Sequence, residues 1–120
     1  MINMDIFLKL KERMKNNFPM LLEIYLRDAE KYIDCIERNL TDGDWDEIII
    51  AAHSFKSASG SLGVLELSET ADKIESDSIR YRDCNEVDAT KIADDFEALK
   101  KIFFAVEPDL RSQLQAAKAI

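Results

Sequence analysis

The segment from Ala51 to Glu75 reads AAHSFKSASGSLGVLELSETADKIE, and the rest of the chain is predicted to pack in support of it. It contains His53, the only histidine of the protein. Histidine is the side chain whose ordinary pKa lies nearest neutrality, so a neutral ring nitrogen is available at physiological pH as a nucleophile or a ligand. The direction in which this side chain points therefore decides what it can do.

Residues 44–62 are predicted to form a helix, in which each residue advances by about 100°. One side of that helix collects the apolar and small residues Ile48, Ala51, Ala52, Phe55, Ala58, Ser59 and Leu62. This is a face of the width that packs against a protein core. His53 lies roughly 150° from the centre of that face, so we expect it to project outward, toward solvent or a partner.

The outward side around the histidine has an unusual composition for a solvated helix. It carries Ile49, Ile50, Lys56, Ser57 and Gly60. Two isoleucines are left outside the core, and a glycine within a helix costs about 1 kcal/mol relative to alanine. The sequence shows no local reason for that glycine. We therefore expect a large partner to approach the imidazole closely.

The spacing of these residues resembles the signature of histidine-containing phosphotransfer (HPt) domains. The matching positions are His53, Lys56, Gly60, Leu62, Gly63, Leu67, Ala71 and Glu75. In that family a lysine follows the histidine after three residues, and small residues and a Leu-Gly pair come next. Ser57 departs from the pattern, because glycine is commonest at its position. The resemblance implies an antiparallel four-helix bundle that carries a phosphoryl group on the histidine between receiver domains of two-component phosphorelays.

The resemblance and the residue chemistry together predict a role for each site residue. His53 is the expected nucleophile, and Lys56 would offset the charge of the phosphate oxygens. Ser57 would donate a hydrogen bond, and Gly60 would leave room for the partner's backbone. The expected docking surface consists of Ile49 and Ile50 together with part of the preceding helix, Met20 or Leu21.

The expected partners are receiver domains of response regulators and of a hybrid sensor kinase. The resemblance implies that the receiver supplies Mg²⁺ and most of the catalysis, so the chain is expected to need no cofactor of its own. The sequence has no glycine-rich nucleotide loop and no acids spaced for magnesium around the histidine. We therefore expect a phosphocarrier without kinase or ATPase activity.

Length and composition indicate one globular domain. The chain has 120 residues, of which 47% are hydrophobic, with only 3 glycines and 2 prolines. That is enough for a single core and favours long helices. The formal net charge of -8 argues against nucleic acid and against an anionic membrane surface as partners. Cys35 and Cys84 lack metal-ligand spacing, so reduced thiols in the cytoplasm are expected.

The apolar periodicity predicts an all-α fold, namely an antiparallel four-helix bundle with an additional short N-terminal helix. The short helix is expected at about 4–15, and the bundle at about 19–106. Within the bundle, Gly43 and Gly63 are expected to end helices, Asp44 to cap the next one, and a loop to begin at Arg82.

The residues from 107 to 120 are predicted to form a C-terminal extension. Pro108 is expected to interrupt the last long helix, and Leu110, Leu114 and Ala117 would align on a final short one. The role of this extension is open. A monomer is expected, and a free-standing carrier is favoured over a fragment of a larger sensor kinase.

Other functions fit the residues less well. One histidine and two separated cysteines do not make a usual zinc site. A histidine-dependent hydrolase would need an orienting acid and an oxyanion hole, which the sequence does not indicate. Trp45, Tyr25 and Tyr32 are interpreted as packing residues. The alternative kept open is a helical adaptor that binds a receiver or another signalling protein without carrying phosphate.

Overall fold

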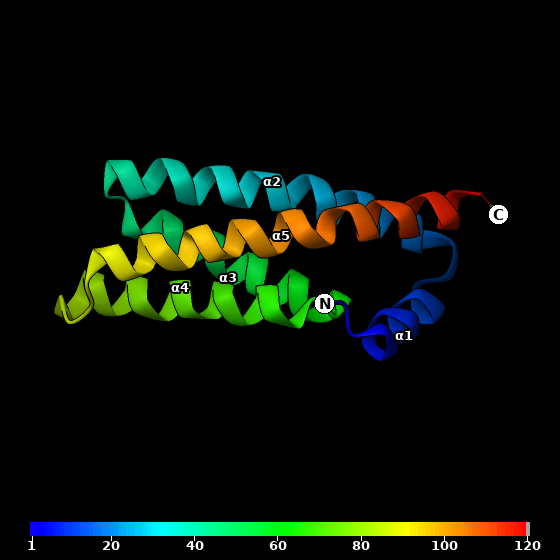
Figure 1. Cartoon of the computed structure of the whole chain (residues 1–120), viewed down its shortest axis with the longest axis horizontal. Coiled ribbons are helices and arrows are strands. Elements are labelled where there is room, and N and C mark those ends of the chain that lie inside the picture. Colours follow the sequence, from blue (N-terminus) through cyan, green and yellow to red (C-terminus); the bar gives the residue numbers. More distant parts are fainter. Residues whose placement is uncertain (120) are drawn as a thin grey trace.

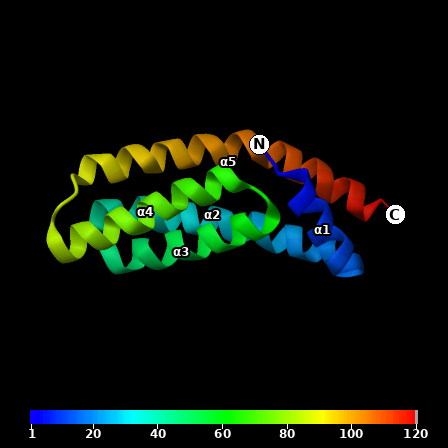
Figure 2. The same cartoon turned by 90° about the horizontal axis from the view of Figure 1, so that it is seen from below.

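The computed structural model describes residues 1–119 and consists of helices throughout its regular structure. A short helix α1 (Met4–Met14) and a 3-10 turn (Lys15–Asn17) precede four long helices. These are α2 (Phe18–Asp42), α3 (Trp45–Leu62), α4 (Leu65–Cys84) and α5 (Ala89–Lys118). The four long helices run side by side with alternating direction, and α1 lies at one end of them (Figures 1 and 2). The predicted fold class is confirmed.

The helix ends follow the residue types of the sequence. Gly43 and Gly63 adopt the left-handed conformation directly after α2 and α3, with φ of 78° and 92°, which glycine reaches without the strain that a Cβ brings. Asp44 caps α3 by accepting a hydrogen bond from the amide of Glu47 at 3.3 Å. Only Gly63 and Val64 connect α3 to α4. So short a connection makes these helices antiparallel neighbours.

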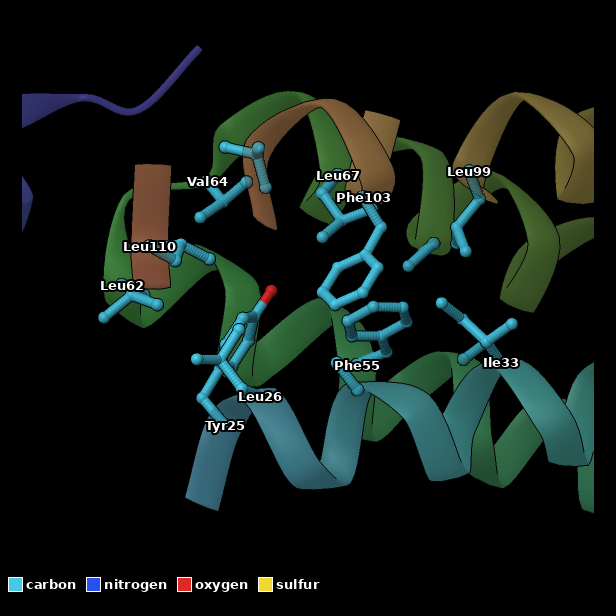
Figure 3. Packing of buried hydrophobic residues seen from close by; sticks show 14 of the residues in the cluster. Tyr25, Leu26, Ile33, Phe55, Leu62, Val64, Leu67, Leu99, Phe103 and Leu110 are labelled. Atoms are coloured by element: carbon cyan, nitrogen blue, oxygen red, sulfur yellow. The ribbon is translucent and has the colours of Figure 1, made fainter. Parts of the chain in front are cut away.

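The core runs along the bundle axis and is built from all four long helices. Figure 3 shows Phe55 of α3 facing Phe103 of α5, with Tyr25 and Leu26 of α2 beside them. The ring centroids of Phe55 and Phe103 are 6.1 Å apart, and neither side chain is exposed. Burial of such aromatic side chains dominates the stability of a core of this size. Tyr25 is buried as predicted.

The N-terminal helix is fastened to the turn between α3 and α4. The backbone amide of Asn3 donates a hydrogen bond to the carbonyl of Gly63 at 2.8 Å, and the side chain of Asn3 caps α1. Phe7 is fully buried and meets Phe18 edge to face, with 5.3 Å between ring centroids. Helix α1 thus closes one end of the bundle, next to the end of α3.

Two predicted boundaries were wrong. Helix α4 continues to Cys84, so the loop predicted from Arg82 begins three residues later. Helix α5 passes through Pro108 without ending, and it includes most of the predicted C-terminal extension. Helix α5 can continue because Pro108 lies on its exposed side, where water can hydrate the carbonyl freed by the missing N–H of the proline.

The buried side of α5 continues without a break on both sides of Pro108. Val106, Leu110 and Leu114 are at most 8% exposed, so burial keeps the helix together across the proline. The last residue of the predicted extension, Ile120, lies outside the described residues. No helix in residues 1–119 is both long enough and apolar enough to cross a membrane.

Candidate functional site

His53 lies in the middle of α3, on the side that faces away from the core. Its side chain is 60% exposed, which confirms the outward direction predicted from the helical period. Ser57, one turn further along, is exposed as well. Ile50 is 61% exposed, whereas Ile49 is half-buried. The exposed ridge of α3 therefore presents an imidazole flanked by an isoleucine and a serine.

The carboxylate of Glu75 on α4 orients the imidazole. His53 Nδ1 lies 2.7 Å from Glu75 Oε2, and the Glu75 side chain is only 14% exposed. An ionised carboxylate can only accept hydrogen bonds, so the Nδ1 of a neutral imidazole must be the donor. That tautomer leaves Nε2 without a proton, with its lone pair available. The ring is thereby prepared to act as a nucleophile through Nε2.

Lys56 joins the same carboxylate from the other side. Its Nζ lies 2.6 Å from Glu75 Oε1 and 3.2 Å from Asp72 Oδ1. The hydrogen bonds to Glu75 and then to Asp72 raise the pKa of the lysine, because both carboxylates favour its charged form. A permanent positive charge thus lies one helical turn from His53, on the side of α3 that faces α4.

The structure gives Gly60 a local role that the sequence did not reveal. A Cβ at this position would lie 3.2 Å from Ser68 Oγ of α4. That hydroxyl is held in place, since it donates a hydrogen bond to the carbonyl of Lys56 at 2.9 Å. The reasoning that nothing local explains the glycine was wrong, because α3 and α4 approach each other closely here. Room for a partner's backbone at Gly60 stays a prediction.

A groove of about 280 Å³ runs beside the exposed ridge of α3, between α1, α2 and α3. It is lined by Leu10, Leu21, Ile24, Tyr25, Asp28, Tyr32, Ala58, Ser61 and Leu62. Of the two residues proposed from α2, Leu21 lines this groove, and Met20 is 60% exposed. The apolar surface beside α3 therefore extends beyond the two isoleucines and the residue of α2 that the sequence predicted.

Sequence reasoning missed the roles of Glu75 and Asp72. Glu75 was recognised as part of the pattern, but no function followed from its position. A signal was present, because the turn at Gly63 folds α4 back along α3. His53 precedes that glycine by 10 residues and Glu75 follows it by 12, so the two lie at nearly the same height on antiparallel helices.

The described residues 1–119 contain no group of three or more histidine, cysteine, aspartate or glutamate side chains placed to hold a metal ion. Cys35 is half-buried and Cys84 is exposed, and both are free thiols.

Comparison with known proteins identifies the family. A family model described as the Hpt domain matches residues 20–119. The chain belongs to the Hpt family. Hpt proteins are phosphocarriers that interact with receiver domains in phosphorelays, so the predicted family and its function as a histidine phosphotransfer protein are confirmed.

The Hpt fold also matches a solved structure. The crystal structure of histidine-containing phosphotransfer protein B (HptB) from Pseudomonas aeruginosa PAO1 is similar, with a TM-score of 0.86. The two chains are 22% identical, and the match covers 96% of this chain and 95% of that one. At this identity the likeness shows a common fold. Among curated protein sequences, none matches the chain at a significant level.

Proposed function

We propose that His53 is the residue of this Hpt protein that carries the phosphoryl group, and that Nε2 is the atom to which it is bound. The observation that supports this most directly is the hydrogen bond between Nδ1 and Glu75. It leaves Nε2 as the nitrogen with a free lone pair, on a side chain that is 60% exposed. The protein contains no other histidine.

The proposed reaction is the transfer of a phosphoryl group from an aspartyl phosphate of a receiver domain. The lone pair of Nε2 attacks phosphorus, the P–O bond to the aspartate breaks, and the aspartate leaves as a carboxylate. The proton on Nδ1 stays on the ring, whose positive charge Glu75 then stabilises. Such a transfer depends on in-line positioning and charge neutralisation more than on covalent help from the protein.

We propose that the receiver brings Mg²⁺ and most of the catalytic groups, so this protein would act as a carrier without kinase or ATPase activity. Lys56, which contacts the same carboxylate as His53, is the cation that would neutralise the phosphoryl oxygens. Ile50 and the groove beside α3 would form the apolar part of the docking surface. The exposed Ser57 would donate a hydrogen bond there. A reducing compartment such as the cytoplasm fits the two free thiols.

The experiment is a phosphotransfer assay on the wild-type protein and His53→Gln. Each is mixed with a panel of phosphorylated receiver domains and Mg²⁺, and separately with phosphoramidate, a small phosphoryl donor. We expect acid-labile label on the wild type alone. Circular dichroism serves as the folding control, since an exposed side chain contributes little to stability.

The result also separates the carrier from an adaptor. An adaptor would bind a receiver equally well as wild type and as His53→Gln, and neither protein would become labelled. Labelling of His53→Gln at the wild-type level would contradict the assignment of the phosphorylated residue. We expect a monomer in this assay, which size-exclusion chromatography checks.

A further inference from the structure

Lys56, which shares Glu75 with His53, is already paired with two carboxylates. Lys56 Nζ contacts Glu75 Oε1 at 2.6 Å and Asp72 Oδ1 at 3.2 Å. Asp72 precedes Glu75 by three residues, so both carboxylates lie on one side of α4. With a neutral imidazole, these three charged side chains carry a net charge of -1. A phosphoryl group arriving at His53 therefore enters surroundings with more negative than positive charge.

The two carboxylates differ in how firmly they hold the lysine. Glu75 is 14% exposed, makes the shorter contact and also holds His53, whereas Asp72 is 57% exposed and makes the longer contact. An exposed ion pair is weakened by water and salt. Lysine has a flexible four-carbon stem. When Lys56 turns toward phosphoryl oxygens on Nε2, its contact with Asp72 is the one that is lost.

We infer that Asp72 competes with the phosphoryl group for Lys56 and so shifts the phosphotransfer equilibrium away from phospho-His53, toward the aspartate of the receiver. This inference rests on the proposed phosphorylation of His53. Asp72 acts without contacting the reacting atoms. It is a positioning residue that acts through Lys56.

The reaction whose equilibrium is affected conserves the phosphoryl group. The P–O bond of the receiver's aspartyl phosphate is exchanged for a P–N bond to Nε2, and the free aspartate carboxylate is the leaving group. No other reactant is consumed. Neutralising Asp72 stabilises only the phospho-His53 side, because only there does Lys56 have phosphoryl oxygens to pair with.

The test measures the equilibrium ratio of phosphorylated Hpt protein to phosphorylated receiver, using a receiver domain that exchanges phosphate with the wild type. We expect Asp72→Asn to shift the ratio about two- to fivefold toward phospho-His53, the range expected when one exposed ion pair is removed. The shift should shrink at high salt. The ratio among the free proteins does not depend on how tightly they dock.

The matched control is Glu66→Gln, which removes the same charge from an exposed position of the same helix. Glu66 and Lys101 of α5 line one hollow, and Lys56 is not among the residues that line it. We expect this variant to leave the ratio at the wild-type value. The shift caused by Asp72→Asn should also disappear in a Lys56→Gln background, since no cation is then left to compete for.

The outcomes are distinguishable. Equal ratios for Asp72→Asn and Glu66→Gln would overturn the inference while leaving the phosphorylation of His53 intact. A shift that persists in the Lys56→Gln background would overturn it too, because it would show simple repulsion between Asp72 and the phosphoryl group. If the wild type accepts no phosphate from any receiver or from phosphoramidate, the proposed function itself fails.

Discussion

Replacing Gly63 by alanine should destabilise the protein more than the same replacement at Gly43. Both glycines end a helix in the left-handed conformation, with φ of 92° and 78°. An L-residue with a Cβ costs about 1 to 2 kcal/mol there. If backbone conformation alone mattered, the two substitutions would lower the free energy of unfolding by about the same amount.

The surroundings of the two glycines differ. A Cβ on Gly43 would meet nothing within 4 Å, whereas a Cβ on Gly63 would lie 2.7 Å from the carbonyl oxygen of Asn3 and 3.3 Å from Ile6 Cβ. The first of these distances is too short to tolerate, so Asn3 must move. Its hydrogen bond to the Gly63 carbonyl, 2.8 Å long, would then be lost or distorted.

The lost hydrogen bond adds about 0.5 to 1.5 kcal/mol to the cost. Weaker packing of α1, whose Phe7 is fully buried, adds to this. We therefore expect Gly63→Ala to cost about 1 kcal/mol or more beyond Gly43→Ala.

The assay is urea unfolding followed by far-ultraviolet circular dichroism, because Trp45 fluorescence would respond directly to changes at the neighbouring Gly43. The difference between the two variants should shrink when residues 1–3 are removed, since the Asn3 carbonyl is then absent. Equal costs for Gly43→Ala and Gly63→Ala in the full chain would refute the reasoning. They would show that the N-terminal segment does not rest on the turn between α3 and α4.

Three further predictions concern the interior of the bundle. Gly60→Ala should change the free energy of unfolding little, because the gain of about 1 kcal/mol in helix propensity is offset by crowding against Ser68. In a Ser68→Ala background the same substitution should stabilise the protein by about that amount. Urea unfolding of the wild type, the two single variants and the double variant would contradict this if Gly60→Ala had the same effect in both backgrounds. The hydroxyl of Tyr25 lies 2.7 Å from Ser59 Oγ. Tyr25→Phe should therefore lower the free energy of unfolding by about 0.5 to 1.5 kcal/mol. Burial raises the pKa of Tyr25 above its usual range, so the unfolded state loses this proton first, and stability should fall as pH rises above about 10, by up to about 1.4 kcal/mol per pH unit. The free energy of unfolding of Tyr25→Phe should therefore fall less steeply with pH than that of the wild type between pH 9 and about 11. The same slope in both proteins would show that this hydroxyl ionises equally easily in the folded and unfolded states.

Much of the fold could be predicted from the chain because its signals are local. The helical period of apolar residues located the four long helices, and Gly43, Asp44 and Gly63 marked their ends through backbone preferences that act within a few residues. The outward direction of His53 followed from the same period. The spacing of His53, Lys56, Gly60 and the pair Leu62-Gly63 indicated the family.

Other features could not be predicted because they depend on contacts between distant segments. Pro108 is a local signal for a helix end, yet the burial of Val106 and Leu110 on the opposite side outweighs it. The explanation for Gly60 lies in Ser68 of α4. A surface such as the groove beside α3 needs residues from three helices.

The sequence by itself determined the helices, the direction of the histidine and the family, since periodicity and residue spacing are properties of the chain. Only the tertiary structure decided which nitrogen of His53 is free and what holds Lys56. Both depend on the distance from α3 to two carboxylates of α4, Glu75 and Asp72. Hydrogen bonds and ion pairs act over about 3 to 4 Å, and such distances are settled only when helices pack.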